Sequence, residues 1–317
     1  MSPGSKSDPY LREETRLAGR KRNLRLRAQM VQSIRTFFVD QDYLEVETPQ
    51  LISAPAPEMH IEAIGADGRY LHPSPELCMK RLLAAGLSRI FQISRCFRKG
   101  ERGDLHLPEF TLLEWYRTGI DYQTLMEECE ALIRFLAKRL TGGEMISYRG
   151  RDIDLRGPWE RISVRVAFDR YASLTLERAL SQGCFDQALV EEIEPHLGNT
   201  RPTCLYDYPA PLAALARLKP GNTTVAERFE IYLAGVEIAN GFSELNDPNE
   251  QRARFEAERR QRAAAGKEGY PLPERFLQSL EDMPEAAGIA LGVDRLAMVF
   301  CDASHIDQVV SFTPEET

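Results

Sequence analysis

Residues 91–116 read FQISRCFRKGERGDLHLPEFTLLEWY, and their pattern decides how the rest of the chain is interpreted. Two apolar runs with aromatic and β-branched residues flank a loop rich in glycine and charge, which predicts a β-hairpin rather than a continuous helix. Because side chains alternate along a strand, Phe110, Glu114 and Tyr116 share one face of the second strand. The first run ends at Arg98, so we expect an aromatic and acidic face beside a guanidinium.

This hairpin allows two interpretations. Arginine presents a rigid fork that suits phosphate oxygens, so an aromatic plate near Arg98 indicates a flat anionic ligand such as a nucleotide. An ordinary amphipathic hairpin, half buried on a sheet, explains the same residues without any ligand. The choice between them depends on the rest of the chain.

The composition excludes several classes of protein. The 317 residues, 43% of them hydrophobic, are enough for one large domain with a sizeable core. A net charge of -8 provides no general attraction to nucleic acid or anionic membranes. No apolar stretch approaches the roughly 18 residues of a membrane-spanning helix, and no secretion signal begins the chain, so we expect a cytoplasmic protein. The six cysteines form no C-x-x-C pair, which argues against a zinc site or a disulfide framework.

The first part of the chain predicts a tail, a helix and an edge strand. Residues 1–23 are polar, and we expect a disordered or frayed tail there. Apolar residues recur with helical spacing over residues 24–39. Residues 43–51 alternate like a strand, and Pro49 confines that strand to a sheet edge. The helix and edge strand predict a dimer contact, although a helix packed on its own domain fits equally well.

A second helix begins at a clear start signal. Ser74 suits the N-cap position, Pro75 the first helical position and Gly86 the C-terminal stop. Glu76 then lies in the first turn, where the helix dipole by itself favours an acidic residue. The position of Glu76 is therefore compatible with a ligand but does not require one.

The middle of the chain predicts mainly helices. Amphipathic patterns cover residues 122–140, 163–180 and 185–197, and residues 203–208 resemble a strand that ends at Pro209. We interpret residues 141–220 as a helical insertion within one domain that spans residues 24–317. Nothing in the insertion indicates chemistry.

A second hairpin carries a group of acidic residues. If the chain turns at residues 234–235, Tyr232 lies opposite Glu237, with Glu230 further along the same face and Glu244 beyond the strand. Clustered carboxylates repel one another unless a cation lies among them, so this site requires Mg²⁺ or an ammonium group. A solvated acidic face is the alternative interpretation.

Residues 288–300, GIALGVDRLAMVF, predict a strand of small residues that leads through Gly292 into a helix with Arg295 near its start. An arginine near a helix N-terminus favours an anion. The sequence contains neither the P-loop pattern nor the Rossmann glycine pattern, which excludes those nucleotide-binding folds.

Taken together, these segments resemble the catalytic domain of class II aminoacyl-tRNA synthetases. The three class motifs correspond to residues 27–49, 98–114 and 288–295. Within the class the chain is most similar to lysyl-tRNA synthetases, through SPEL at 74–77, PEFT at 108–111 and EIANGFSELND at 237–247. The resemblance implies an α+β fold in which helices flank an antiparallel sheet, with the first motif forming a homodimer.

One difference from lysyl-tRNA synthetases narrows the choice of subfamily. Lysyl-tRNA synthetases carry an anticodon-binding domain before the first motif, and this sequence has no room for it, so we expect no tRNA anticodon binding. The chain is similar to truncated paralogues that attach (R)-β-lysine to a lysine of elongation factor P. This implies ATP and Mg²⁺ as cofactors, (R)-β-lysine or lysine as the amino acid and elongation factor P as the partner. A stand-alone amide ligase acting on a small molecule and an amino-acid-sensing module remain the alternatives.

The resemblance also assigns roles to individual residues. It implies that Arg98 and Arg295 act in catalysis on the α- and γ-phosphates, and that Glu230 and Glu237 bind Mg²⁺. The implied ATP contacts are Arg98, Lys99, Gly100, His106, Leu107, Phe110, Glu237, Ile238, Gly292 and Arg295. The implied amino-acid contacts are Ser74, Pro75, Glu76, Tyr116, Asn240, Phe242, Glu244 and Ala290.

Three positions depart from the family pattern. Gly100 replaces a common glutamate and Leu107 a common asparagine, which affects the contacts expected with adenine; Glu101 is a candidate substitute for the missing acid. Ala290 replaces a glycine that is typical of lysyl-tRNA synthetases. Its extra methyl group on the pocket floor should displace an α-amino acid more than a β-amino acid.

Overall fold

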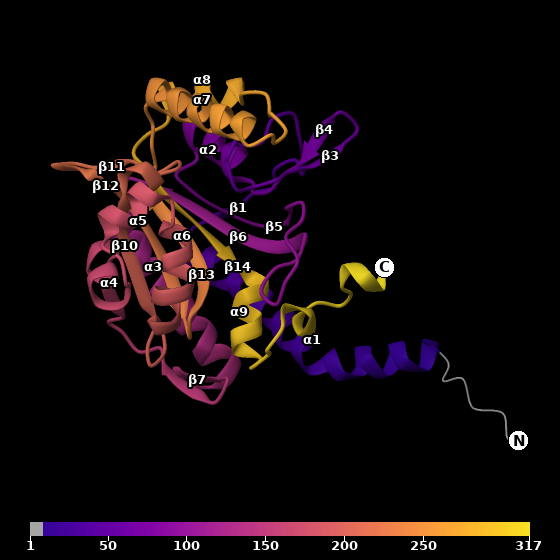
Figure 1. Cartoon of the computed structure of the whole chain (residues 1–317). Coiled ribbons are helices and arrows are strands. Elements are labelled where there is room, and N and C mark those ends of the chain that lie inside the picture. The colour runs from indigo at the N-terminus through magenta and orange to yellow at the C-terminus, as the bar shows by residue number, and fades with distance from the viewer. Residues whose placement is uncertain (1–8) are drawn as a thin grey trace, which may run out of the picture.

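The computed structural model describes residues 9–317, and a nine-stranded sheet forms its centre (Figure 1). The strand order is β1-β5-β6-β14-β13-β12-β10-β9, and β11 pairs with β12. Their bounds are β1 Leu44–Glu45, β5 Arg89–Phe97, β6 Glu109–Thr118, β9 Glu160–Ser163, β10 Thr203–Pro209, β11 Leu218–Lys219, β12 Asn222–Leu233, β13 Val236–Ser243 and β14 Ala286–Gly292. Only the outer pairs β1–β5 and β9–β10 are parallel, so the predicted antiparallel α+β fold is confirmed.

The helices form separate groups around this sheet. Their bounds are α1 Pro9–Val39, α2 Glu76–Ala84, α3 Tyr122–Thr141, α4 Val164–Tyr171, α5 Leu176–Gln182, α6 Phe185–Ala188, α7 Pro248–Ala264, α8 Glu274–Ser279 and α9 Val293–Phe300. Helices α1, α3 and α9 cover one face, while α2, α7 and α8 gather at one end of the molecule (Figure 1). None of the helices in residues 9–317 combines the length and the apolar character needed to cross a membrane.

The predicted hairpin at residues 91–116 is confirmed as β5 and β6. Phe91 lies opposite Trp115 in the register, and both are fully buried. Phe38 of α1 stacks on Phe91 with a centroid distance of 4.8 Å and also contacts Trp115. This aromatic cluster joins the first helix to the central strands, so the opposite face of the hairpin is left for other contacts.

The predicted tail is wrong for residues 9–23, which form the first half of α1; residues 1–8 lie outside the described part of the chain. Contacts with the C-terminal segment explain the longer helix. Arg16 and Arg20 both pair with Glu316 at 2.8 Å, and Asn23 donates to the carbonyl of Gln308. The polar sequence was misleading because its charged residues find their partners almost 300 positions away.

The strand predicted at residues 43–51 is also much shorter than expected. Leu44 and Glu45 form the edge strand β1, and Pro49 lies in the segment that follows it. Leu51–Ile52 then forms β2 of a separate small sheet with β4, Arg69–Leu71, and β3, Ile64–Ala66. The alternating pattern is therefore divided between two sheets.

The insertion at 141–220 is not purely helical. Strands β9 and β10 extend the central sheet, and β7, Met145–Tyr148, pairs with β8, Arg151–Asp154. The helix expected over 163–180 is interrupted because Thr175 accepts a hydrogen bond from the backbone of Arg178 and starts a new helix. The segment expected to be helical over 185–197 continues beyond α6 as a π-helical turn, Leu189–Ile193, and a 3-10 turn, Glu194–His196.

Gly241 lies where side chains pack tightly on the face of the sheet that α1, α3 and α9 cover. A Cβ atom there would lie 2.8 Å from the ring of Phe229 and 2.9 Å from Cβ of Ile289, which is closer than packed atoms approach. We expect Gly241→Ala to lower the free energy of unfolding by about 1–3 kcal/mol, measured by urea denaturation. Gly269→Ala, where no atom lies within 4 Å of the new Cβ, is the control and should change stability by less than about 0.5 kcal/mol. Equal effects in the two variants would contradict this packing.

Candidate active site

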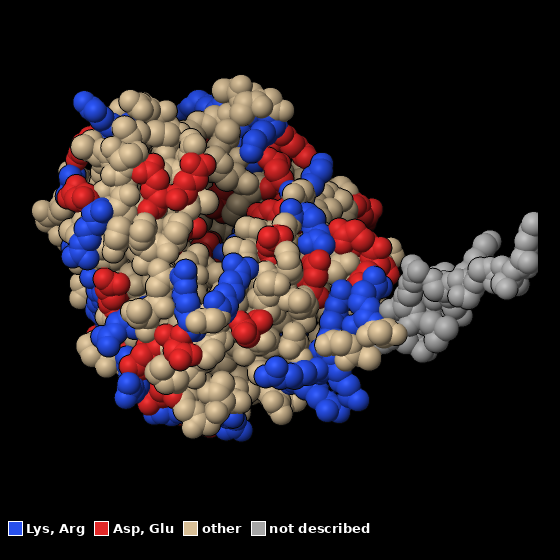
Figure 2. Space-filling view, turned by 60° about the horizontal axis from the view of Figure 1, so that its bottom comes forward, with Lys and Arg blue, Asp and Glu red and all other residues tan. Residues whose placement is uncertain are grey.

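The candidate site lies on the face of the sheet opposite α1, α3 and α9, where cross-strand pairs place the predicted residues in two adjacent rows. One row runs through Glu114, Ala290, Asn240 and Glu230. The next runs through Tyr116, Gly288, Phe242 and Arg228. Directly opposed residues in a sheet share a face, so segments far apart in the sequence meet on one surface. In Figure 2 one face of the molecule is hollowed near its centre, with acidic side chains inside the hollow.

A β-bulge at Ile238 completes this face. Tyr232 pairs with Glu237, but the next pair is Ile231 with Ala239, so Ile238 has no direct partner. The extra residue reverses the alternation and places Glu237 on the same side as Asn240. The predicted Tyr232–Glu237 pairing is thus confirmed, and the turn at residues 234–235 forms with positive φ at both residues.

The predicted amino-acid contacts surround a buried carboxyl group, that of Glu114. Ser74 Oγ donates to one oxygen of Glu114 at 2.6 Å, and the Tyr116 hydroxyl donates to the other at 2.7 Å. Ser74 also accepts a hydrogen bond from the backbone of Glu76 at 3.0 Å. The N-cap residue of α2 is Pro75 and not Ser74, so the helix begins one residue later than predicted. Burial, followed by the nearby charge of Glu76, raises the pKa of Glu114 to about 7.

A lysine that sequence reasoning missed occupies the centre of this group. Lys80 is fully buried on α2, and its Nζ lies 2.6 Å from Glu76 and also contacts Glu244. Burial is the main reason that the pKa of Glu244 rises to about 8. The spacing of Glu76 and Lys80 on one helix was a signal for their pairing, but nothing local indicated the contact with Glu244.

The predicted phosphate contacts meet at the start of α9. Arg295 Nη1 donates to Glu237 Oε2 at 2.9 Å and to its carbonyl at 3.0 Å. Arg295 Nη2 donates to His106 Nε2 at 2.6 Å, so the imidazole carries its proton on Nδ1. Burial and, secondly, the charge of Arg295 lower the pKa of His106. Gly292 is the N-cap residue of α9 and lies next to this group.

Arg98 forms the other cationic part of the site. Its guanidinium lies 5.0 Å from the ring centroid of Phe110, and Glu101, the proposed substitute acid, lies 3.7 Å from it. Among the described residues, the buried Nε of Arg98 finds no acceptor, which is consistent with a missing anionic ligand. Lys99 is exposed and bonds through its backbone to Glu62.

Besides Gly292, three of the predicted ATP contacts do not offer a side chain to a ligand. Gly100 has φ of +79°, a backbone conformation that disfavours the glutamate expected from the resemblance. Leu107 is buried in the main core, and Ile238 is buried at the bulge. Leu107 and Ile238 can therefore contact ATP only through main-chain groups, because their side chains pack against the protein.

Glu230 and Glu237 are suitable for a divalent cation. Glu230 accepts hydrogen bonds from Arg228 at 2.7 Å and from Tyr232 at 2.6 Å. Burial and then the charge of Glu237 raise the pKa of Glu230, so a cation between them would relieve the repulsion. The described residues contain no group of three or more acidic, histidine or cysteine ligands for a metal. Two carboxylates are sufficient for Mg²⁺ when substrate phosphates and waters supply the other ligands.

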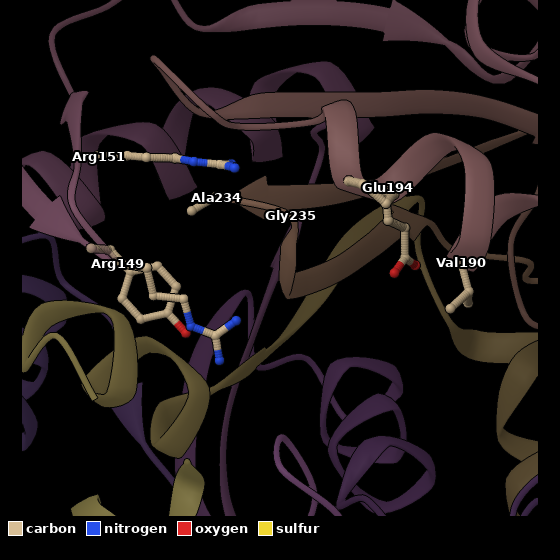
Figure 3. A pocket seen from close by; sticks show the side chains of 8 residues that line it. Arg149, Arg151, Val190, Glu194, Ala234 and Gly235 are labelled. Atoms are coloured by element: carbon tan, nitrogen blue, oxygen red, sulfur yellow. The ribbon is translucent and has the colours of Figure 1, made fainter. Parts of the chain in front are cut away.

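The insertion contributes an acid that the sequence did not indicate. Glu194 Oε1 lies 3.2 Å from the Tyr232 hydroxyl, whose proton is donated to Glu230, and burial followed by the charges of Glu237 and Glu230 raises the pKa of Glu194 to about 7. Glu194 lines a pocket of about 280 Å³ at the β12–β13 turn, with Arg149 and Arg151 across from it (Figure 3). No local pattern connects Glu194 to the acids of β12 and β13, because only the tertiary fold brings them together.

Residues 10–316 match the family of class II tRNA synthetases (D, K and N). The chain belongs to this family. The elongation factor P–(R)-β-lysine ligases of Proteus mirabilis and Vibrio cholerae are each 41% identical to it, covering 92% and 91% of this chain and 94% of the relatives. The ligase of the same name from Klebsiella pneumoniae is 39% identical, covering 92% of this chain and 94% of the relative. Family membership supports an ATP-dependent ligase.

The raised pKa of Glu114 predicts a specific dependence of stability on pH. Its folded value of about 7 exceeds the roughly 4.3 of an unstructured chain, so ionisation opposes folding as pH rises between these values. Glu114→Gln removes this penalty. Relative to wild type, we expect the variant to gain about 2 kcal/mol between pH 5.5 and pH 8 in urea unfolding. A difference between the two proteins that stays constant with pH would contradict the buried, neutral carboxyl.

Proposed function

We propose that the protein is an ATP-dependent ligase that activates (R)-β-lysine as an adenylate and transfers it to a lysine of elongation factor P. The observation that carries the proposal is the single sheet face on which an acidic pocket adjoins two arginines. Such a face suits a diamino acid beside a nucleotide. The names of relatives about 40% identical over nine-tenths of the chain support the same activity.

In the first step the amino-acid carboxylate attacks the α-phosphorus of ATP and pyrophosphate leaves. Arg98 stabilises charge on the transferring phosphorus, Arg295 and the neutral His106 hold the distal phosphates, and Phe110 stacks on adenine. Mg²⁺ bound by Glu230 and Glu237 would neutralise phosphate charge. The chain supplies no nucleophile, so positioning and electrostatics provide the catalysis.

In the second step the ε-amine of a lysine on elongation factor P attacks the adenylate carbonyl and AMP leaves, which forms an amide. The amino acid stays anchored because Glu76 and Glu244 bind its ammonium groups, assisted by Asn240 and Phe242. The decisive experiment is mass spectrometry of elongation factor P after incubation with the protein, ATP and β-lysine. One added β-lysyl group is expected.

Two alternatives are distinguished by the same assay. A stand-alone amide ligase would form the adenylate but leave elongation factor P unmodified. An amino-acid-sensing module would form no adenylate, but Arg98, Arg295, Glu230 and Glu237 are all present, which favours an enzyme. An unmodified partner would therefore reject the proposed ligase, and the presence or absence of the adenylate would then separate the two alternatives.

We also propose that the protein forms a homodimer through α1 and the edge strand β1. Val39 and Leu44 are more than half exposed at this end of the helix and strand. Large apolar residues on an unpaired strand edge suit a second copy of the chain.

Loss of either arginine should impair the first step strongly. We expect Arg98→Ala and Arg295→Ala each to slow amino-acid-dependent pyrophosphate exchange by about two orders of magnitude or more, because each removes a charge-stabilising donor. Arg252→Ala, which removes a partly exposed arginine of α7 paired with Glu274 of α8, is the control and should retain wild-type exchange. Near-normal exchange in either active-site variant would exclude that arginine from the mechanism.

Ala290 is the proposed determinant of β-amino acid preference. It lies between Glu114 and Asn240 in the register and is partly exposed on the ligand face, so its methyl group forms the pocket floor. We expect Ala290→Gly to shift the ratio of kcat/KM values towards α-lysine, measured by pyrophosphate exchange with each isomer. An unchanged ratio would show that the methyl group plays no part in the choice.

A further inference from the structure

Lys80 joins three residues of the proposed amino-acid pocket through one ammonium group. Its Nζ lies 2.6 Å from Glu76 Oε1, contacts Glu244 Oε2 and lies 5.0 Å from the ring centroid of Phe242. The side chain has no solvent exposure. A single fixed cation therefore lies among the groups proposed to bind the ammonium groups of the substrate.

Stability alone does not explain a charge at this position. Met79 and Leu83, its neighbours on α2, are fully buried and apolar, so an apolar residue at position 80 would continue the core. Burying an ion pair generally contributes less to stability than a well-packed apolar side chain of the same size, because both ions lose their hydration. The charge of Lys80 therefore needs a role in the site itself.

The two carboxylates that contact Lys80 each retain an oxygen for another partner. Lys80 contacts Oε1 of Glu76 and Oε2 of Glu244, and no other donor in the described residues reaches either carboxylate. Glu244 Oε1 is completely buried and has no hydrogen-bond partner among residues 9–317. An ideal Cβ on Gly288 would lie 2.5 Å from this oxygen, which places it over the sheet between Tyr116 and Phe242. A buried oxygen without a donor indicates a donor on the ligand.

We propose that Lys80 is the positioning residue that selects a diamino acid: it holds Glu76 Oε1 and Glu244 Oε2 in place and leaves the other oxygen of each for a substrate ammonium. This inference rests on the proposed function and extends it. Lys80 does not touch the reacting atoms. It acts through the two carboxylates, and a substrate that lacks one ammonium would leave one of their oxygens without a partner.

The charges around the pocket explain why a cation would help to bind a cation. Besides Lys80, the groups that face Glu76 and Glu244 are Glu114 and Tyr116 of β6 and Glu58 of the loop after β2. Without Lys80 these carboxyl groups would repel one another, and protons would neutralise some of them. Fewer anions would then remain for the substrate, so removal of a positive charge should weaken the binding of a diamine.

The test compares Lys80→Met, Lys80→Arg and wild type in pyrophosphate exchange. We expect Lys80→Met to raise the KM for β-lysine at least about tenfold, as loss of one partner of a buried charge pair does, and to leave the KM for ATP within about twofold. The ratio of kcat/KM for β-lysine to kcat/KM for its analogue without the terminal ammonium should fall by the same factor. In the pH profile of kcat/KM for β-lysine, the apparent pKa of the acidic limb should rise by about one pH unit. Lys80→Arg should retain part of the selectivity.

Two controls separate a positioning role from a structural one. Lys219→Met removes an ion-paired lysine that contacts Asp207 outside the pocket, and it should leave selectivity unchanged. If Lys80→Met does not fold, Lys80→Gln, which also removes the charge but leaves Glu76 and Glu244 in place, replaces it and should show the same loss of selectivity.

The outcomes are distinguishable. Wild-type selectivity in a folded Lys80→Met or Lys80→Gln variant, or equal changes in the KM values for ATP and β-lysine, would overturn the role of Lys80. A wild-type protein that activates neither lysine nor β-lysine would reject the proposed function itself, and the inference with it.

Discussion

The cross-strand register of β6, β14, β13 and β12 is the constraint on which the site depends. Because opposed residues share a face, Glu114, Ala290, Asn240 and Glu230 form one continuous row although they come from four strands. The bulge at Ile238 is essential to this arrangement, since an unbroken ladder would point Asn240 and Glu237 to opposite faces. The backbone pairing therefore determines where the chemistry lies before any side-chain contact is considered.

The opposite face of the same strands carries the core. Phe38 packs on Phe91 and Trp115 there, and Gly241 allows Phe229 and Ile289 to approach the backbone closely. Each strand thus supplies alternate residues to two different tasks. The apolar face gives rigidity, and a rigid sheet holds polar side chains in place on the other face at little further entropic cost.

Charge is distributed unevenly over the ligand face. At one end, Lys80 contacts Glu76 and Glu244, with Glu114 nearby, and burial raises the pKa of Glu114 and Glu244. Towards the other end lie Arg98, Arg295 and the acids suited to a metal. The arrangement is complementary to a cationic amino acid joined to an anionic nucleotide, and it explains why an acidic protein can bind ATP.

Local sequence determined the hairpins, the turn at residues 234–235 and, to within one residue, the start of α2, because alternation, turn chemistry and capping depend on residues within a few positions of one another. The motifs also identified most of the acids and both arginines. Only the tertiary structure decided the bulge at Ile238, the approach of Glu194 from the insertion, the extension of α1 to Pro9 and the contact between Lys80 and Glu244. Each of these depends on residues far apart in the sequence, whose contacts form only when the whole chain has folded, so no local pattern could predict them.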